Sequence, residues 1–251
     1  MWTSTEISPE LRWSAVEEKR KKEDNSFFIK RPSNLKRLEG LFIFMLGLIF
    51  FITAPLMSQE LDKKELGQNN IRLLFSKEID PGSLSYRPEK GESLYEISRK
   101  FNMSPELLIE INEIKDREEL PDRLKIVPGR FTIRVERGKN ILTLYREGQF
   151  FKEYKVATGR DLSTPLGEYW IASKLISPPW IFEGKVITPD QPDYPLGTRW
   201  LGLSGTRLGL HGTKDPEYIG QYVSSGCIRM FNTDIEELFK IVPFGTKVII
   251  Y

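Results

Sequence analysis

Cys227 is the only cysteine of the sequence, and it follows the only histidine, His211, within one short stretch. A thiol becomes a strong nucleophile when a neighbouring imidazole accepts its proton. Gly226 stands directly before the cysteine and has no side chain, so backbone amides there can approach a carbonyl oxygen and donate hydrogen bonds to the anion formed on attack. Acyl transfer is therefore the chemistry that these residue types imply.

The same two residue types also have purely structural roles. A lone cysteine commonly packs as a small buried apolar residue, and a lone histidine is commonly structural as well. With one residue of each type, the chain cannot hold an internal disulfide or a zinc site built from several cysteine and histidine ligands. The sequence implies no cofactor and no metal.

Alternating apolar and polar residues predict strands around the candidate nucleophile. Apolar side chains at every second position of 131–136 indicate a half-buried strand, and a polar turn at 137–140 leads into a second strand at 141–145. Further strand-like runs lie at 150–157, 167–173 and 247–251. Residues 130–251 are therefore expected to form a mainly β domain, a sandwich or barrel with one short helix.

That helix is expected to begin directly after the cysteine motif. Asn232 or Thr233 is the predicted N-cap, Asp234 and Glu236 favour the helix dipole, and Pro243 ends the helix.

Residues 82–129 have the pattern of a small βααβ unit. Ser93 with Glu96 makes a capping box that begins one short helix, and Ser104 before Pro105 caps a second. Strands are expected on both sides, at 86–88 and 123–127.

Two motifs in this unit, GESL at 91–94 and LKIVP at 124–128, resemble the LysM module. The resemblance implies binding to N-acetylglucosamine-containing glycan strands such as those of peptidoglycan. The alternative is that the unit only spaces the next domain from the membrane.

Residues 40–57 contain 18 positions without a charged side chain, which is about the minimum length of a membrane-spanning helix. The sequence predicts a transmembrane helix at 38–57; a buried core helix or the apolar part of a signal peptide is the alternative. Lys and Arg are frequent in 1–37, so this tail is expected to be cytoplasmic and the rest extracytoplasmic, anchored by a single pass in the cell membrane. Residues 58–81 are interpreted as a linker.

The charge balance excludes one class of partner. Lys and Arg number 37 against 35 Asp and Glu, so the net charge is only +2. A strongly basic domain is absent, and nucleic acid is not an expected partner.

The residues around the cysteine resemble the catalytic domain of L,D-transpeptidases, also called YkuD. His211 begins the motif His-Gly-Thr, and Ser224 begins Ser-x-Gly-Cys-Ile-Arg-Met, with an Asp in the following helix. Earlier signatures of that family appear in their expected order, ATG at 157–159, TPLGE at 164–168 and PLGTRW at 195–200. The resemblance covers 130–251 almost entirely.

The resemblance implies a cysteine acyltransferase that acts on peptidoglycan stem peptides. Cys227 would attack the carbonyl between the third residue, diaminopimelate or lysine, and a terminal D-alanine. His211 would accept the thiol proton, with its ring oriented by a backbone carbonyl at or next to Gly212. Release of D-alanine and transfer of the acyl group to an amine would cross-link the cell wall. Because family members commonly form stable thioesters with carbapenems, a carbapenem is the expected covalent inhibitor.

The same resemblance implies roles for the residues beside the nucleophile. The amides of Ser225, Gly226 and Cys227 would form the oxyanion hole, and Arg229 would face the substrate; a structural salt bridge is the alternative for Arg229. Ser225 stands where many family members have a second histidine, which affects fine tuning rather than activity.

Other functions fit parts of this pattern. A sortase also uses His, Cys and Arg, but its His and Cys are far more widely separated in the chain. Papain-like and NlpC-type peptidases place the cysteine before the histidine, which is the reverse of the order here. Water as the acceptor would make the protein an L,D-carboxypeptidase, and an idle site would leave a wall-binding protein without catalysis.

Overall fold

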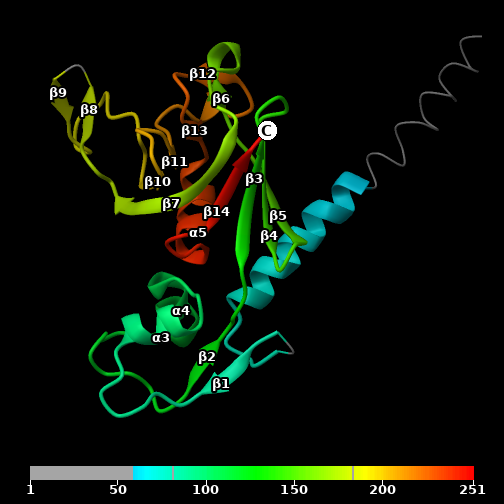
Figure 1. Ribbon diagram of the computed structural model, residues 1–251, viewed down its shortest axis with the longest axis vertical. Coiled ribbons are helices and arrows are strands. Elements are labelled where there is room, and N and C mark those ends of the chain that lie inside the picture. The colour runs from blue at the N-terminus through cyan, green and yellow to red at the C-terminus, as the bar shows by residue number, and fades with distance from the viewer. Residues whose placement is uncertain (1–58, 81, 183) are drawn as a thin grey trace, which may run out of the picture. The chain divides into compact units, whose positions relative to one another are not determined.

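The structure is a computed structural model that describes residues 59–80, 82–182 and 184–251. These residues comprise a helix, a small α/β unit and a larger β-rich domain (Figure 1). The predicted cytoplasmic tail and transmembrane segment lie outside the described residues. Within the part of the chain that is described, no helix is long and apolar enough to cross a membrane.

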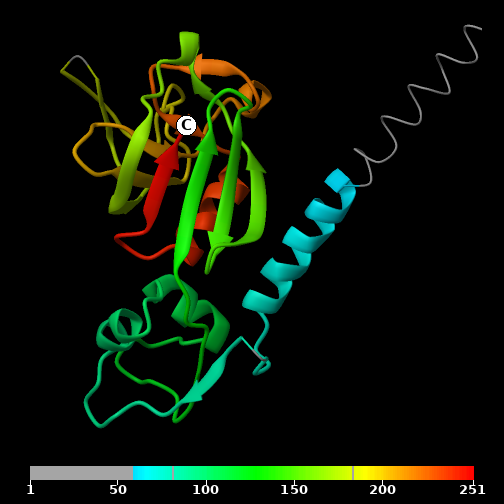
Figure 2. The same ribbon diagram turned by 45° about the vertical axis from the view of Figure 1, so that its right-hand side comes forward.

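The β-rich domain is built on one mixed sheet of eight strands in the order β13-β11-β10-β7-β14-β3-β4-β5. Figure 2 shows several of these strands side by side. Their bounds are β3 (Phe131–Glu136), β4 (Ile141–Arg146), β5 (Gln149–Lys155), β7 (Gly167–Ile176), β10 (Arg199–Leu203), β11 (Gly209–His211), β13 (Ile228–Arg229) and β14 (Lys247–Ile250). A mainly β domain is confirmed, and eight of its strands belong to one sheet.

The sheet curls at β7, its longest strand. The first part of β7, from Gly167 to Trp170, pairs with β14, whereas the part from Ile171 to Ile176 pairs with β10. One strand therefore carries the chain from one half of the sheet to the other, and Figure 1 shows its bend. The short strands β10, β11 and β13 lie beyond this bend, and they carry the residues of the candidate site.

Helix α5 (Asn232–Ile241) packs against β10 and β11 through Ile235, Leu238 and Phe239. The predicted cap was wrong, because the N-cap is Phe231 and no side chain caps the helix. The Asn232 side chain instead bonds to backbone groups of neighbouring loops.

Smaller elements complete this domain. β6 (Thr158–Gly159) pairs in parallel with β12 (Tyr222–Ser224), and β8 (Trp180–Phe182) forms a hairpin with β9 (Lys185–Ile187). Two 3-10 turns, η1 (Arg160–Leu162) and η2 (Pro216–Tyr218), lie in the connecting loops.

The small α/β unit has the predicted order of elements: β1 (Leu84–Tyr86), α3 (Leu94–Lys100), α4 (Pro105–Asn112) and β2 (Leu124–Ile126). The capping box of Ser93 and Glu96 is present, and the Ser104 side chain accepts from the amide of Leu107. β1 ends before Pro88, two residues earlier than predicted, since proline has no amide to donate to the strand ladder. β1 pairs antiparallel with β2.

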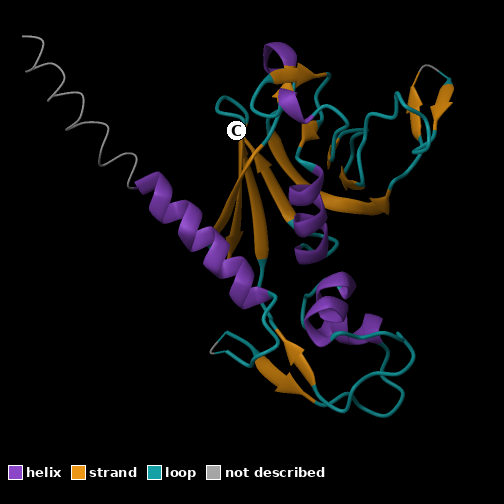
Figure 3. Cartoon of the chain, turned by 180° about the vertical axis from the view of Figure 1, so that it is seen from behind, coloured by secondary structure: helices purple, strands orange, loops and turns teal. Residues whose placement is uncertain are grey.

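Residues 59–74 are helical, although the sequence predicts a linker there (Figure 3). The helix contacts β5, where the Asn70 side chain donates to the carbonyl of Phe151 at 2.8 Å and Leu74 is buried. Lys125 of β2 donates to the carbonyl of Ser76 at 2.8 Å, just after the helix ends. These partners are remote in sequence, which explains why local composition indicated a linker.

The α/β unit also contacts the β-rich domain through α4 and α5. The Ser104 side chain donates to the carbonyl of Lys240, and Lys240 forms an ion pair with Glu110 at 2.8 Å. Lys174 of β7, almost fully buried, forms an ion pair with Glu106 at 2.7 Å.

Candidate active site

Cys227, His211 and Arg229 line one pocket of about 370 Å³, within the usual size range for a ligand site. Most of its wall is apolar. The lining residues are Leu175, Pro178, Pro179, Trp180, Ile181, Pro195, Leu196, Trp200, Arg207, Leu208, His211, Ser224, Ser225, Cys227 and Arg229. The tertiary structure therefore gathers the sequence-predicted site residues at the short strands beyond the bend of β7.

His211 is the last residue of β11, between Trp200 of β10 and Arg229 of β13 in the strand register. The imidazole is buried, 3% exposed, and stacks on the Trp200 ring with centroids 5.6 Å apart. Its Nδ1 lies 2.6 Å from the carbonyl oxygen of Gly212. Because a carbonyl only accepts, Nδ1 carries the proton and Nε2 keeps its lone pair for another proton.

Cys227 lies in the turn between β12 and β13, its thiol is not in a disulfide, and the residue as a whole is partly exposed. Ser224 shapes this turn, since its hydroxyl donates to the carbonyl of Cys227 at 2.6 Å and accepts from the amide of Gly226 at 3.1 Å. Gly226 has φ +128°, a conformation that favours glycine. The amide of Gly226 thus has a partner in the Ser224 hydroxyl, and the expected oxyanion-hole roles of Ser225, Gly226 and Cys227 stay predictions.

Arg229 has no ion-pair partner among the described residues, and its buried Nε has no hydrogen-bond partner there. The structural salt bridge that was an alternative for this residue is therefore absent from the part of the chain that is described. Its backbone bridges to Ala157, which fixes the strand beside the pocket.

Burial keeps both members of the Cys/His pair neutral at pH 7. It lowers the pKa of His211 to about 4, aided by the charge of Arg229 and opposed by the carbonyls of Gly212 and Leu196. Burial also raises the pKa of the Cys227 thiol, opposed by the amide of Gly209 and by Arg229. A neutral imidazole can accept a proton, and the thiol is protonated at pH 7.

Asn232 supports the site in a way that its sequence position did not reveal. Its Oδ1 accepts from the amides of Thr213 and Thr198, and its Nδ2 donates to the carbonyl of Thr213. A Cβ at Gly197 or at Gly212 would collide with this oxygen, so both glycines are required by the close approach. The only sequence signal was a polar residue beside the cysteine motif.

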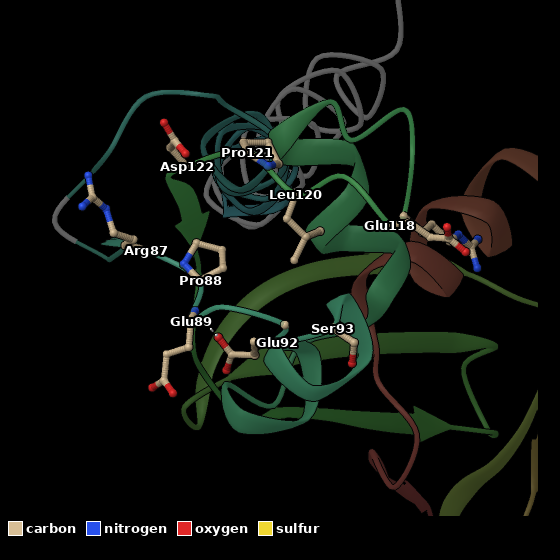
Figure 4. A pocket seen from close by; sticks show the side chains of 11 residues that line it. Arg87, Pro88, Glu89, Glu92, Ser93, Glu118, Leu120, Pro121 and Asp122 are labelled. Atoms are coloured by element: carbon tan, nitrogen blue, oxygen red, sulfur yellow. Dashed lines mark hydrogen bonds between the residues drawn. The ribbon is translucent and has the colours of Figure 1, made fainter.

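A second pocket, of about 660 Å³, lies in the α/β unit (Figure 4). It is formed by the segment before α3 and the segment before β2. Its lining residues are Arg87, Pro88, Glu89, Gly91, Glu92, Ser93, Arg117, Glu118, Leu120, Pro121 and Asp122. Charged groups and backbone surround a few apolar atoms, as suits a polar ligand.

Comparisons with known proteins agree with this arrangement. The family model of the L,D-transpeptidase catalytic domain, YkuD, matches residues 130–250, and that of the LysM domain matches 89–121. The putative L,D-transpeptidase YkuD of Bacillus subtilis is 34% identical over 175 residues, 66% of this chain and 98% of the relative. The putative L,D-transpeptidase YqjB of the same organism is 38% identical over 130 residues, 49% of this chain and 73% of the relative.

Among solved structures, the catalytic domain of an Enterococcus faecium L,D-transpeptidase is similar with a TM-score of 0.41 and 23% identity, covering 48% of this chain and 96% of that chain. The sequence matches are the decisive ones, since nearly the whole of the Bacillus subtilis relative is covered. The chain therefore belongs to the L,D-transpeptidase family, with a YkuD catalytic domain that follows a LysM domain.

Proposed function

We propose that Cys227 and His211 carry out L,D-transpeptidation on peptidoglycan stem peptides. One observation carries the assignment of roles: the ring of His211 is held through Nδ1 by the Gly212 carbonyl, in the pocket that the thiol shares. This leaves Nε2 to accept the thiol proton.

In the first half-reaction, Nε2 takes the proton of Cys227 as sulfur bonds to the carbonyl carbon between the third stem residue and D-alanine. The carbonyl oxygen becomes an anion, and amides of Ser225 and Cys227 donate to it, since the Gly226 amide already donates to Ser224. When the tetrahedral intermediate collapses, the C–N bond breaks and His211 returns the proton to the departing amine. D-Alanine leaves, and the acyl group remains on sulfur as a thioester.

In the second half-reaction, an acceptor amine attacks the thioester while His211 removes one of its protons. The C–S bond breaks, the thiolate recovers a proton, and a new peptide bond joins two stems. The positive charge of Arg229 lowers the pKa of the Cys227 thiol, so it favours the thiolate and an anion formed beside it. The same charge disfavours the protonated form of His211, which makes the imidazole quick to give its proton up again.

The decisive experiment incubates residues 59–251 with a disaccharide tetrapeptide and follows the products by mass spectrometry. A cross-linked dimer with loss of one D-alanine is expected. A disaccharide tripeptide alone would make the protein an L,D-carboxypeptidase, and an unchanged substrate would leave a wall-binding protein. Cys227→Ala serves as the control that forms neither product.

The pocket of Figure 4 is the proposed glycan site of the LysM domain. Its mixture of carboxylates, guanidinium groups and backbone matches the hydroxyl and amide groups of an amino-sugar polymer. Glycan binding there would hold the enzyme on the polymer whose stem peptides it joins.

A membrane anchor at residues 38–57 is a further part of the proposal. It is supported by the 18 uncharged positions of 40–57 and by the basic residues that precede them. Detergent dependence of the full chain during extraction from membranes, compared with residues 59–251, tests it.

A further inference from the structure

We infer that Arg207 is a specificity-determining residue that binds a carboxylate group of the donor stem peptide. The inference rests on the proposed transpeptidase function. It assigns a role to a residue that lies outside the motifs of His211 and Cys227. Arg207 belongs to the turn between β10 and β11, and its side chain lines the same pocket as the thiol.

The backbone that carries Arg207 is held firmly. Across the turn, the amide of Leu203 donates to the carbonyl of Leu208 at 2.9 Å. The amide of Leu208 in turn donates to the Thr206 hydroxyl at 3.0 Å, and Gly205 supplies the positive φ, +69°, that the turn requires. Arg207 is thus presented from a fixed position.

This position is close to the reacting atoms. The next residue, Leu208, lies against the turn of the nucleophile: a Cβ at Gly226 would be only 3.2 Å from Leu208 Cδ2. One residue further, the amide of Gly209 interacts with the Cys227 thiol. When the attacked carbonyl of a substrate lies at the thiol, the neighbouring parts of that substrate therefore lie near residues 207–209.

Arg207 provides the positive charge of this pocket that can bind a ligand. Of the lining residues, only Arg207 and Arg229 carry a charge at pH 7, and none is acidic. Arg229 acts on the catalytic pair, whereas Arg207 is exposed and has no hydrogen bond or ion pair to any residue in the described ranges. A guanidinium group with free donors, set among apolar walls, fits a carboxylate in a two-bonded arrangement.

The proposed substrate offers such groups. A stem tetrapeptide ends in the carboxylate of the leaving D-alanine, one residue beyond the attacked carbonyl. A third residue of the diaminopimelate type carries another carboxylate at the end of its side chain, whereas lysine at that place carries none. The shared ligand chemistry is a carboxylate, and the two sources are separated by the choice of donor.

The test pairs each protein variant with each donor peptide, so that the loss of the arginine and the loss of a carboxylate can be compared. Initial rates are measured with a diaminopimelate tetrapeptide, its C-terminal amide, and the same peptide with lysine as third residue, for wild type, Arg207→Gln and Arg207→Lys. With the donor that keeps the recognised carboxylate, Arg207→Gln is expected to lower kcat/KM about 10- to 100-fold, chiefly through KM. With the donor that lacks it, wild type and Arg207→Gln should differ less than about twofold. Arg207→Lys should recover part of the loss, because a lysine keeps the charge but not the two-bonded geometry.

Controls separate recognition from folding. Arg130→Gln removes another exposed arginine, outside the pocket lining, and should leave all three donors unaffected. Thermal unfolding and the alkylation rate of Cys227 should be the same in Arg207→Gln as in wild type.

Two outcomes overturn the inference: an equal loss with every donor, which marks a structural role, and no loss with any donor. If wild type is inactive on all three donors while its thiol still reacts with an alkylating reagent, the proposed function fails instead. Failure of the proposed function is distinguishable from failure of the Arg207 inference, because it is seen with the wild-type protein alone.

Discussion

Asn232 holds the backbone of Thr213 at both of its polar groups: Oδ1 accepts from the amide at 3.1 Å, and Nδ2 donates to the carbonyl at 3.0 Å. Thr213 lies two residues after His211, and the intervening Gly212 carbonyl orients the imidazole. The first residue of α5 thus secures the loop that sets the ring of the proposed base.

Replacing Asn232 with Ala should lower both stability and turnover. Loss of these hydrogen bonds leaves buried backbone groups unpaired, at about 2 kcal/mol in unfolding free energy, and the displaced loop should reduce kcat about tenfold. Urea unfolding and steady-state kinetics measure the two effects. Thr233→Ala is the matched control. The sequence offered Asn232 or Thr233 as the helix cap, and since no side chain caps the helix, Thr233→Ala should change neither stability nor turnover.

Cys227→Ala and His211→Gln should each abolish acyl transfer, by at least about a thousandfold, because nucleophile and base act as one unit. The double variant should be no worse than either single one. Turnover is followed by mass spectrometry of the tetrapeptide reaction, and circular dichroism checks the fold. Wild-type turnover in Cys227→Ala would refute the mechanism.

Acid should destabilise the protein through His211. The folded-state pKa of His211 is about 4, below the unfolded value of 6.5, so between these values the unfolded chain binds a proton that the folded chain does not. The free energy of unfolding is therefore unaffected by protonation of His211 above pH 6.5. It decreases as the pH falls to 4, by about 3 kcal/mol. Unfolding free energies of wild type and His211→Gln, measured at pH 7 and pH 4, should show this loss in wild type only.

The same titration should limit catalysis. Protonation of Nε2 removes the base, so kcat/KM should stay level from pH 7 to about pH 5 and fall as the pH passes about 4. An acid limb centred near 6.5 would show that the imidazole is solvated in the active enzyme.

Imipenem should acylate Cys227 once per chain, since its strained lactam carbonyl can take the place of the scissile amide. Intact-mass spectrometry and peptide mapping locate the adduct. In His211→Gln the adduct should form far more slowly, and its rate should rise with pH as the thiol ionises without a base. A wild-type chain that alkylates readily but resists excess imipenem would indicate an idle site.

The LysM pocket yields a matched pair of variants. Arg117 lines the pocket, whereas Lys115 is an exposed basic residue of the same loop outside it. Arg117→Ala should weaken co-sedimentation of residues 59–251 with purified peptidoglycan about tenfold, through loss of charge-assisted hydrogen bonds. Lys115→Ala should sediment like wild type; equal weakening in both would point to nonspecific charge attraction.

Local patterns in the sequence were enough to predict the elements whose causes are local. The capping box of Ser93 and Glu96 begins its helix because both partners lie within one turn. The strand of residues 131–136 follows from alternation alone, and the Cys227 and His211 motifs indicated the chemistry by residue type and order. Each of these signals is contained in a few neighbouring residues.

The tertiary structure decided what depends on residues far apart in the chain. Asn232 is of a residue type that commonly caps helices. Its side chain instead bonds to the backbone of a neighbouring loop, because buried backbone groups must find hydrogen-bond partners. The helix at 59–74 is stabilised by contacts with β5 and β2 that no local pattern encodes. Likewise Arg207 reaches the pocket of Cys227 only because β11 pairs with β13, and the neutral state of His211 arises from burial by the completed sheet.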